Sequence, residues 1–458
     1  MLKDRVDTGP GGDGSWRSVV AGSQGRLTVG LVLVTLTVAT EALIITAIMP
    51  VIVRDIGGLQ YYGLAFSAFF LAGLASIPTA GWAVDRYGPS APFAVLIGIF
   101  IVGSTLAALA PSMPLLVLAR AAQGYGATAQ FTLTQSTIAR VYHGAARVKV
   151  LSLMSATWTV PGLVGPAMGA AIATTLGWRW AFGAIVAPAL AACLLTYPSL
   201  RKVAAPRGEK PPLAVRWPIQ VAAGAGLIVL GLTSPPFPGL VAVAAGIPLV
   251  LIALRHTLPV GSLLARPGLP SVVAAAFFLN TAFYAASAFV PLLLIRLLDV
   301  PIAAAGAAVS ASTIAWSAGV WLNTLLVDRY RRSLLLLGSA LLLALGTAIF
   351  ASTLAGGPLP LAYCGWILAG FGMGICFNTF TLSAMVMAPK GREGAALSGR
   401  NLTGSLGTAM GTGVGGAVVA ASTGLQLGLR PALAFVYGMS ILSALATAAL
   451  ALRSSPNN

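Results

Sequence analysis

The sequence predicts an all-α, polytopic membrane protein, and three observations indicate that class. The 458 residues are 57% hydrophobic, only 8% are charged, and the mean hydropathy is +0.91. A soluble chain carries about 25% charged residues, so this one could not cover a water-exposed surface. Apolar runs of about 20 residues, long enough to cross a bilayer, recur from end to end. They do not alternate polar with apolar residues, which favours helices over barrel strands.

The boundaries of the spans follow from the residues that interrupt the apolar runs. Polar residues, glycines and prolines separate the runs, as in segments 110–112 and 356–358. Fourteen spans are predicted, at 27–50, 61–84, 91–110, 114–140, 150–175, 180–199, 214–233, 238–254, 270–295, 303–326, 333–353, 359–386, 396–421 and 431–452. As an alternative, the seventh and eighth form one re-entrant hairpin or lie on the surface, which leaves twelve.

The order of the spans predicts five regions. Residues 1–26 are polar and rich in glycine, which is typical of a disordered tail. Residues 27–200 predict an N-terminal six-helix bundle, 201–268 a cytoplasmic loop with two extra transmembrane helices, and 269–452 a C-terminal six-helix bundle. Residues 453–458 predict a second tail.

The two predicted bundles share an internal repeat. Residues 84–87 read VDRY, and the same four letters return at 327–330, 243 residues later. The GYG at 124–126 is followed 246 residues later by the GFG that starts at Gly370. Nearly equal offsets in the same order predict two bundles of parallel orientation, which is a transporter architecture with its site near the membrane midplane.

The basic residues predict the orientation in the membrane. Of the 27 Lys and Arg residues, Arg120 lies inside a span, and four lie in one set of loops, namely Arg54, Arg179, Arg296 and Arg430. The other 22 fall on the side of both termini, and cytoplasmic loops carry the excess of Lys and Arg. We therefore expect a multi-pass protein of the cell inner (plasma) membrane with both termini cytoplasmic. The net charge of +17 is then a topology signal, and no nucleic-acid partner is expected.

One carboxylate stands apart from the other acidic residues. Of ten Asp and Glu residues, only Glu41 lies well inside a span. Placing a carboxylate there costs at least about 2.5 kcal/mol, so such a residue is a functional candidate. The alternative is a carboxyl group kept protonated or hydrogen-bonded as part of the packing.

The fourth span carries a polar stripe. Gln123, Gln130 and Thr134 follow Arg120, the one base well inside a span, at +3, +10 and +14, which places all four on one helical face. A polar stripe on an apolar helix should face a watery cavity or another helix. For the glutamines, the alternative is hydrogen bonding between helices.

Three motifs, in order along the chain, resemble those of the major facilitator superfamily, and within it the fourteen-span drug:proton antiporters. The resemblance covers residues 27–452. Residues 81–88 resemble the loop motif GxxxDxxG, 120–126 resemble RxxQGxG, and 162–170 resemble the antiporter motif GxxGPxxGG, with Ala170 in place of the last glycine. The resemblance implies functional roles for the following residues. In the loop motif and its second copy they are Gly81, Asp85, Arg86, Gly88, Asp328 and Arg329. In span four they are Arg120, Gln123, Gly124 and Gly126, and in the antiporter motif they are Pro161, Gly162, Gly165, Pro166 and Gly169.

The resemblance implies a secondary active transporter that exports amphipathic small molecules (drugs) in exchange for protons by alternating access. Its expected partners are the substrate, protons and the lipid bilayer, and the proton gradient replaces any cofactor. Glu41 and Arg120 are the expected proton-coupling pair, and the carrier is expected to be a monomer. One alternative is an exporter of a specific metabolite, siderophore or lipid; a remoter one is a non-transporting receptor or scaffold. An enzyme is not expected, because no histidine lies in a span and no nucleophile–base or metal set is evident.

Polar and aromatic residues inside the spans predict the lining of a substrate cavity. Apolar walls with few polar anchors suit amphipathic molecules, and aromatic faces attract cations. For any single aromatic, the alternative is packing or lipid contact. The predicted cavity residues are Gln130, Phe131, Thr134, Trp158, Asn280, Tyr284, Trp316 and Asn378.

Overall fold

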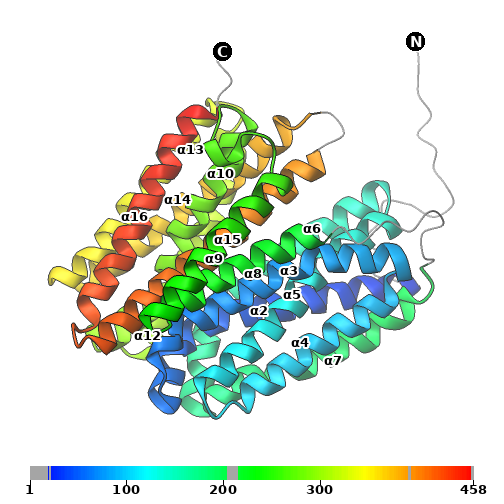
Figure 1. The fold of residues 1–458 in the computed structure, drawn as a ribbon. Coiled ribbons are helices and arrows are strands. Elements are labelled where there is room, and N and C mark those ends of the chain that lie inside the picture. Colours follow the sequence, from blue (N-terminus) through cyan, green and yellow to red (C-terminus); the bar gives the residue numbers. More distant parts are fainter. Residues whose placement is uncertain (1–18, 20–21, 204–214, 390–392, 455–458) are drawn as a thin grey trace.

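A computed structural model describes residues 19, 22–203, 215–389 and 393–454, and these ranges contain helices and no strand (Figure 1). The predicted tails at 1–26 and 453–458 lie largely outside the described residues. The described helices form fourteen rods, whose ends agree with the fourteen predicted spans to within six residues.

The rods follow one another as long helices joined by short turns. The first six are α2 (Gly22–Ile56), α3 (Tyr62–Tyr87), α4 (Ser90–Ala108), α5 (Met113–Val141), α6 (Gly144–Thr175) and α7 (Trp178–Leu200). Two more follow, α8 (Arg216–Leu232) and α9 (Pro236–Thr257). The last six are α10 (Leu269–Asn280), continued through a π-helical segment (Thr281–Ala285) into α11 (Ala286–Leu297), then α12 (Ile302–Leu326), α13 (Arg332–Ala351), α14 (Leu359–Val386), α15 (Glu393–Gly424) and α16 (Leu429–Arg453). Short 3₁₀ turns lie at Leu59–Tyr61, Ser262–Leu264 and Ser352–Ala355.

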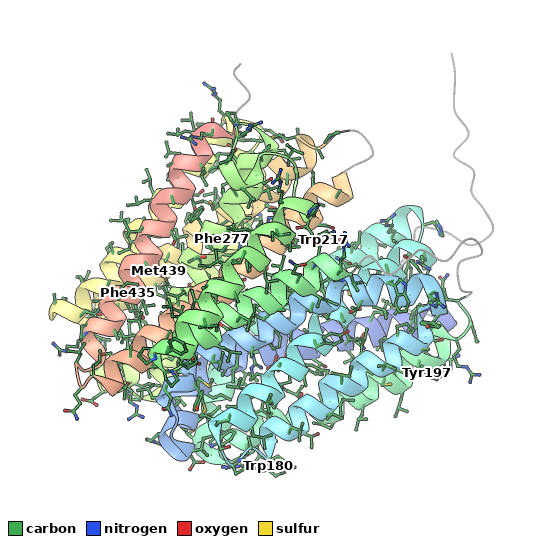
Figure 2. The ribbon with its side chains drawn as sticks, viewed as in Figure 1. Trp180, Tyr197, Trp217, Phe277, Phe435 and Met439 are labelled. Atoms are coloured by element: carbon green, nitrogen blue, oxygen red, sulfur yellow. The ribbon has the colours of Figure 1, made fainter. Side chains whose placement is uncertain are left out.

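The outer surface of the helices is apolar, as a lipid environment requires. Eleven of the described helices are long and apolar enough to cross a membrane; α5, α8 and α15 are not among them. Large apolar side chains are exposed on the outside, including Trp180, which is 58% exposed, and Phe435, which is 49% exposed (Figure 2). The chain is therefore a multi-pass membrane protein, with its polar stripes turned inward.

The internal repeat is visible in how the helices pack. Gly124 of α5 lies against the backbone of Phe69 on α3, and Gly370 of α14 lies against the backbone of Ser312 on α12. Phe69 and Ser312 are themselves 243 residues apart. Helices approach this closely only where a side chain is missing. The glycines of the repeated motif therefore set the same crossing in both halves.

Gly124→Ala should destabilise the N-terminal half. The added Cβ meets the Phe69 backbone, so α3 and α5 must move apart, and overpacking costs about 1–3 kcal/mol. Gly81→Ala is the matched control, because a Cβ there meets nothing within 4 Å. Thermal unfolding of the purified protein should show a lower midpoint for Gly124→Ala only. Equal midpoints for both variants would mean that this crossing is not close.

The inserted pair α8 and α9 forms a packed hairpin between the two halves (Figure 1). A Cβ at Gly224 of α8 would lie 2.9 Å from the carbonyl oxygen of Gly246 on α9, so the two helices are in close contact. Val221 of α8 shares one apolar cluster with Leu71 of α3 and Leu406 of α15. The hairpin therefore touches both halves along one side of their junction.

The two halves contact each other directly at one end of the molecule. This end carries the loops with Arg54, Arg179, Arg296 and Arg430. The Tyr62 hydroxyl on α3 donates to the carbonyl oxygen of Ala288 on α11 at 2.9 Å. Beside it, Gly63 of α3 crosses Gly416 of α15 backbone to backbone. In Figure 1 the two sets of helices meet near this end and fan apart toward the other. The side predicted to face outward is therefore the closed one.

Candidate functional site

A buried ion pair lies inside the N-terminal half. Arg120 of α5 donates from Nη1 directly to Oε1 of Glu41 on α2, and the two side chains are 2% and 1% exposed. The other two salt bridges among the described residues join side chains that are 30% to 51% exposed. The structure thus brings together the two charged residues that hydropathy alone singles out.

A polar network holds the guanidinium of Arg120. Its Nη1 also donates to Gln123 Oε1 at 3.0 Å, and Gln123 Nε2 donates to Ser104 Oγ of α4 at 3.1 Å. The face of Phe69 lies 4.5 Å from the guanidinium carbon. These contacts fix the cation in place, whereas Oε2 of Glu41 is buried without a partner. A free, buried carboxylate oxygen of this kind is a natural position for a proton.

The loop motif forms its contacts within its own half. Asp85, near the end of α3, accepts from Arg140 Nη2 of α5 at 2.6 Å. The chain turns at Gly88, whose φ of 78° favours glycine. In the second copy, Asp328 and Arg329 are exposed and form no salt bridge with another described residue.

The antiporter motif on α6 contacts two partners. Gly165 and Gly169 face Leu43 and Ile44 of α2, the residues that follow Glu41 by two and three positions. On the other side, Gly162 faces Thr313 of α12. Here α6 lies between the helix that bears the buried carboxylate and a helix of the C-terminal half, and its prolines Pro161 and Pro166 allow it to bend.

Comparison with known families agrees with the motifs and the fold. The model of the Major Facilitator Superfamily matches residues 31–412, which is most of the chain. The chain belongs to the major facilitator superfamily.

Relatives of this transporter are named for efflux. A probable multidrug-efflux transporter of Mycobacterium tuberculosis, Rv1634, is 26% identical over 437 residues, covering 90% of this chain and 91% of its own. The multidrug transporter protein MdtP of Bacillus subtilis is 28% identical over 156 residues, or 34% of this chain and 29% of its own. The efflux pump FUS6 of Gibberella moniliformis is 29% identical over 154 residues, and the match spans only 27% of that pump.

Solved structures show the same fold at low sequence identity. A bacterial homologue of the human lysosomal transporter Spinster, in an inward-facing conformation, superposes with a TM-score of 0.64 at 16% identity, covering 94% of this chain and 95% of the other. The POT family transporter PepTSo gives a TM-score of 0.69 at 14% identity, covering 94% and 99%. These likenesses concern the major facilitator fold alone.

Aromatic side chains gather where the transporter's two halves meet. Tyr284 lies 6.1 Å from Phe70 and 6.3 Å from Trp316, and Trp316 lies 5.5 Å from Phe377, measured between ring centroids. All four rings are partly exposed. We call Phe70, Tyr284, Trp316 and Phe377 the junction cluster. Tyr284 sits in the π-helical segment, a distortion that frequently marks functional sites.

The other six predicted cavity residues are not members of the junction cluster. Gln130 donates to the carbonyl oxygen of Phe93 on α4 at 2.9 Å and is 1% exposed, and Thr134 is 2% exposed. Asn280 donates to the carbonyl oxygen of Ala276 in its own helix at 2.8 Å. All three are buried, but only Gln130 bonds between helices: Asn280 bonds within its own helix, and the Thr134 hydroxyl has no hydrogen-bond partner among the described residues. The remaining three are Phe131 and Trp158, which face each other at 6.4 Å and are 42% and 40% exposed, and the half-buried Asn378.

A second buried arginine escaped the sequence prediction. The charge pattern predicts Arg120 as the one base well inside a span, but Arg400 of α15 is also buried, at 4% exposure. Arg400 follows the start of the predicted span 396–421 by four residues, where a long side chain can reach the membrane surface. The polar Asn401 beside it and the glycines that follow were signals of a packed, inward-facing helix.

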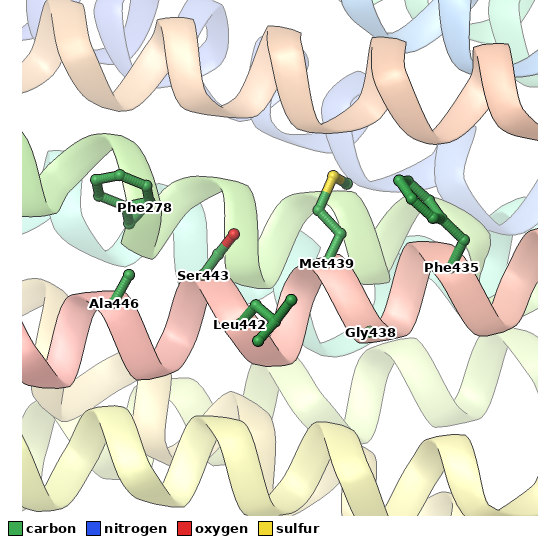
Figure 3. Close-up of a pocket in the computed structure, with 7 residues that line it drawn as sticks. All are labelled: Phe278, Phe435, Gly438, Met439, Leu442, Ser443 and Ala446. Atoms are coloured by element: carbon green, nitrogen blue, oxygen red, sulfur yellow. The ribbon is translucent and has the colours of Figure 1, made fainter.

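An apolar groove on the outer surface lies apart from these groups. Phe278 of α10 and Phe435, Met439 and Leu442 of α16 line it (Figure 3). Leu442 is 69% exposed, so the groove belongs to the lipid-facing surface.

Proposed function

We propose that the protein is a proton-coupled exporter of amphipathic small molecules that works by alternating access in the plasma membrane, with both termini cytoplasmic. The observation that carries this proposal is the buried Glu41–Arg120 pair, which sits beside the antiporter motif of α6. The proton gradient is the energy source, no cofactor is needed, and the carrier acts as a monomer.

In the proposed cycle, Glu41 changes its charge as the carrier changes sides. Ionised Glu41 neutralises Arg120 and holds α2 against α5. A proton on Oε2 removes that attraction and leaves an uncompensated cation, which favours a rearrangement of the buried network. Because α6 packs on α2 at Leu43 and on α12 at Thr313, movement at the pair reaches the junction of the two halves. Proton uptake from outside then accompanies substrate release, and proton loss inside resets the carrier.

The contact of Gly63 with Gly416 should act as the outer closure. Gly63→Leu should prevent this crossing, hold the outer side open and stop transport. In a protein without native cysteines, Ala288→Cys, a position now 3% exposed, should then react with a membrane-impermeant maleimide from outside. Gly438→Leu is the control, because no atom lies within 4 Å of its Cβ position. Unchanged labelling of Ala288→Cys in the Gly63→Leu protein would refute this closure.

A susceptibility panel tests the proposed function itself. An efflux-deficient bacterial host carrying the wild type should survive higher concentrations of several unrelated amphipathic compounds than a host carrying Glu41→Gln at equal expression. Equal growth inhibition by every compound in the two strains would contradict multidrug export.

A further inference from the structure

Arg400 is a buried cation whose donors are poorly satisfied. Its guanidinium carries five N–H donors, and two hydrogen bonds are formed: Nη1 donates to Asn401 Oδ1 at 3.0 Å, and Nη2 donates to the carbonyl oxygen of Phe377 at 3.4 Å. Nε is buried without an acceptor. No described carboxylate lies within salt-bridge distance, and the ionisable side chains near its charge, Tyr284 and Cys376, are ordinarily neutral at physiological pH.

The contacts of Arg400 do not explain a buried charge. The Phe377 carbonyl oxygen already accepts from Thr381 Oγ1 at 2.7 Å, and 3.4 Å is longer than the usual N–H···O distance. A buried cation without an anion is strongly unfavourable. The buried cation of Arg120 is neutralised by the carboxylate of Glu41, whereas Arg400 has no carboxylate partner among the described side chains.

The position of Arg400 connects it to the junction cluster. Its guanidinium carbon lies 4.0 Å from the centroid of the Phe377 ring. The Phe377 ring contacts that of Trp316, which in turn contacts that of Tyr284. The cation therefore stands at one edge of a partly exposed aromatic wall between the two halves. Arg400 is seven residues from Glu393, the first residue of α15, or about 10 Å along the helix from its predicted cytoplasmic end.

We propose that Arg400 binds the anionic end, a carboxylate or sulfonate, of an amphipathic substrate whose apolar body packs on the junction cluster. Among the described buried charges, Glu41 and Arg120 cancel, so Arg400 leaves one net positive charge that attracts an anion and repels a cation. A guanidinium also offers two parallel donors to a carboxylate. This inference rests on the proposed export function and specifies organic anions as its substrate class.

Three probes with the same ring, one anionic, one cationic and one neutral, test the proposal. The purified protein is placed in nanodiscs of phosphatidylcholine, so that no anionic lipid competes, and binding is followed by energy transfer from tryptophan to pyrene. The wild type should bind pyrenebutyrate at least about 10-fold more tightly than pyrenebutyltrimethylammonium or the neutral pyrenebutanol, since hydrogen bonds to charged groups have that strength. Equal affinity for the three probes would overturn the proposal without any variant.

Substitutions then assign the effect to Arg400. Arg400→Gln should weaken pyrenebutyrate binding about 10-fold or more, Arg400→Lys should recover part of the loss, and the cationic probe should bind no worse. Arg430→Gln, which removes an exposed arginine, is the matched control and should leave all affinities unchanged. Unchanged pyrenebutyrate binding in Arg400→Gln, or an equal loss for all three probes, would show that Arg400 is not an anion site.

The binding assay separates this inference from the proposed function. It uses no proton gradient, so tighter binding of the cationic probe, together with export of cations in exchange for protons, would refute the anion site and leave the coupled export intact. Pyrenebutyrate binding that depends on Arg400, without any transport, would support the site and refute the export.

Discussion

Glu41→Gln should reduce proton-driven export to the background measured without the protein, while substrate binding remains. Glutamine has nearly the shape of a protonated glutamate, and its side-chain oxygen can still accept from Arg120 Nη1. It cannot ionise, so the carrier stays in the state that corresponds to a bound proton and the cycle cannot reset. Efflux of a preloaded fluorescent substrate from energised cells measures the first effect, and equilibrium binding to the purified protein measures the second.

The control for Glu41→Gln is another carboxylate-to-amide change. Asp299 is exposed and has a φ of 51°, a conformation that asparagine also tolerates. Asp299→Asn should therefore export at the rate of the wild type. Proton-driven efflux by Glu41→Gln at the wild-type rate would exclude Glu41 as the coupling residue.

Arg120→Gln should both destabilise the protein and stop coupled transport. It leaves the 1%-exposed Glu41 without its cation, and breaking one side of a buried ion pair costs about 3–5 kcal/mol. It also removes the donors to Gln123 and to the carbonyl oxygen of Ala65. Thermal unfolding in detergent and efflux from energised cells measure the two effects.

The double variant Glu41→Gln with Arg120→Gln separates stability from coupling. Removing both charges also removes the uncompensated carboxylate, so the unfolding midpoint should recover toward that of the wild type, whereas export should stay at background. A double variant as unstable as Arg120→Gln alone would contradict the account of the pair as mutually compensating charges.

The sequence predicts the fold well because a membrane limits the alternatives. Each apolar run must become a helix with its backbone groups satisfied, which is why the rods coincide with the predicted spans. Glu41 could be found for the same reason, because it lies nine residues from the nearer end of its predicted span, and Arg120 was marked in addition by the motif that resembles RxxQGxG. Arg400 could not, because it lies only four residues into its predicted span and resembles a residue that extends to the membrane surface.

Helical periodicity alone was less informative about the lining of the site. It predicts that Gln130 and Thr134 share a face with Arg120, and all three are buried. It cannot tell a face that meets a neighbouring helix from one that meets a cavity, and α4 accepts the bond from Gln130. In the ninth span, the π-helical segment at Thr281–Ala285 interrupts the regular spacing between Asn280 and the residues that follow it. A local change in helical register of this kind leaves no simple periodic signal.

Proton movement in proteoliposomes tests the central claim most directly. Vesicles enclosing a pH-sensitive dye receive an imposed gradient of a compound to which the wild type confers resistance, with no initial pH difference. The proposed coupling through Glu41 predicts that the substrate gradient drives protons in the opposite direction through the wild type, and that Glu41→Gln, which still binds the compound, moves none. Substrate movement through the wild type without any change of internal pH, or an equal change with Glu41→Gln, would contradict it.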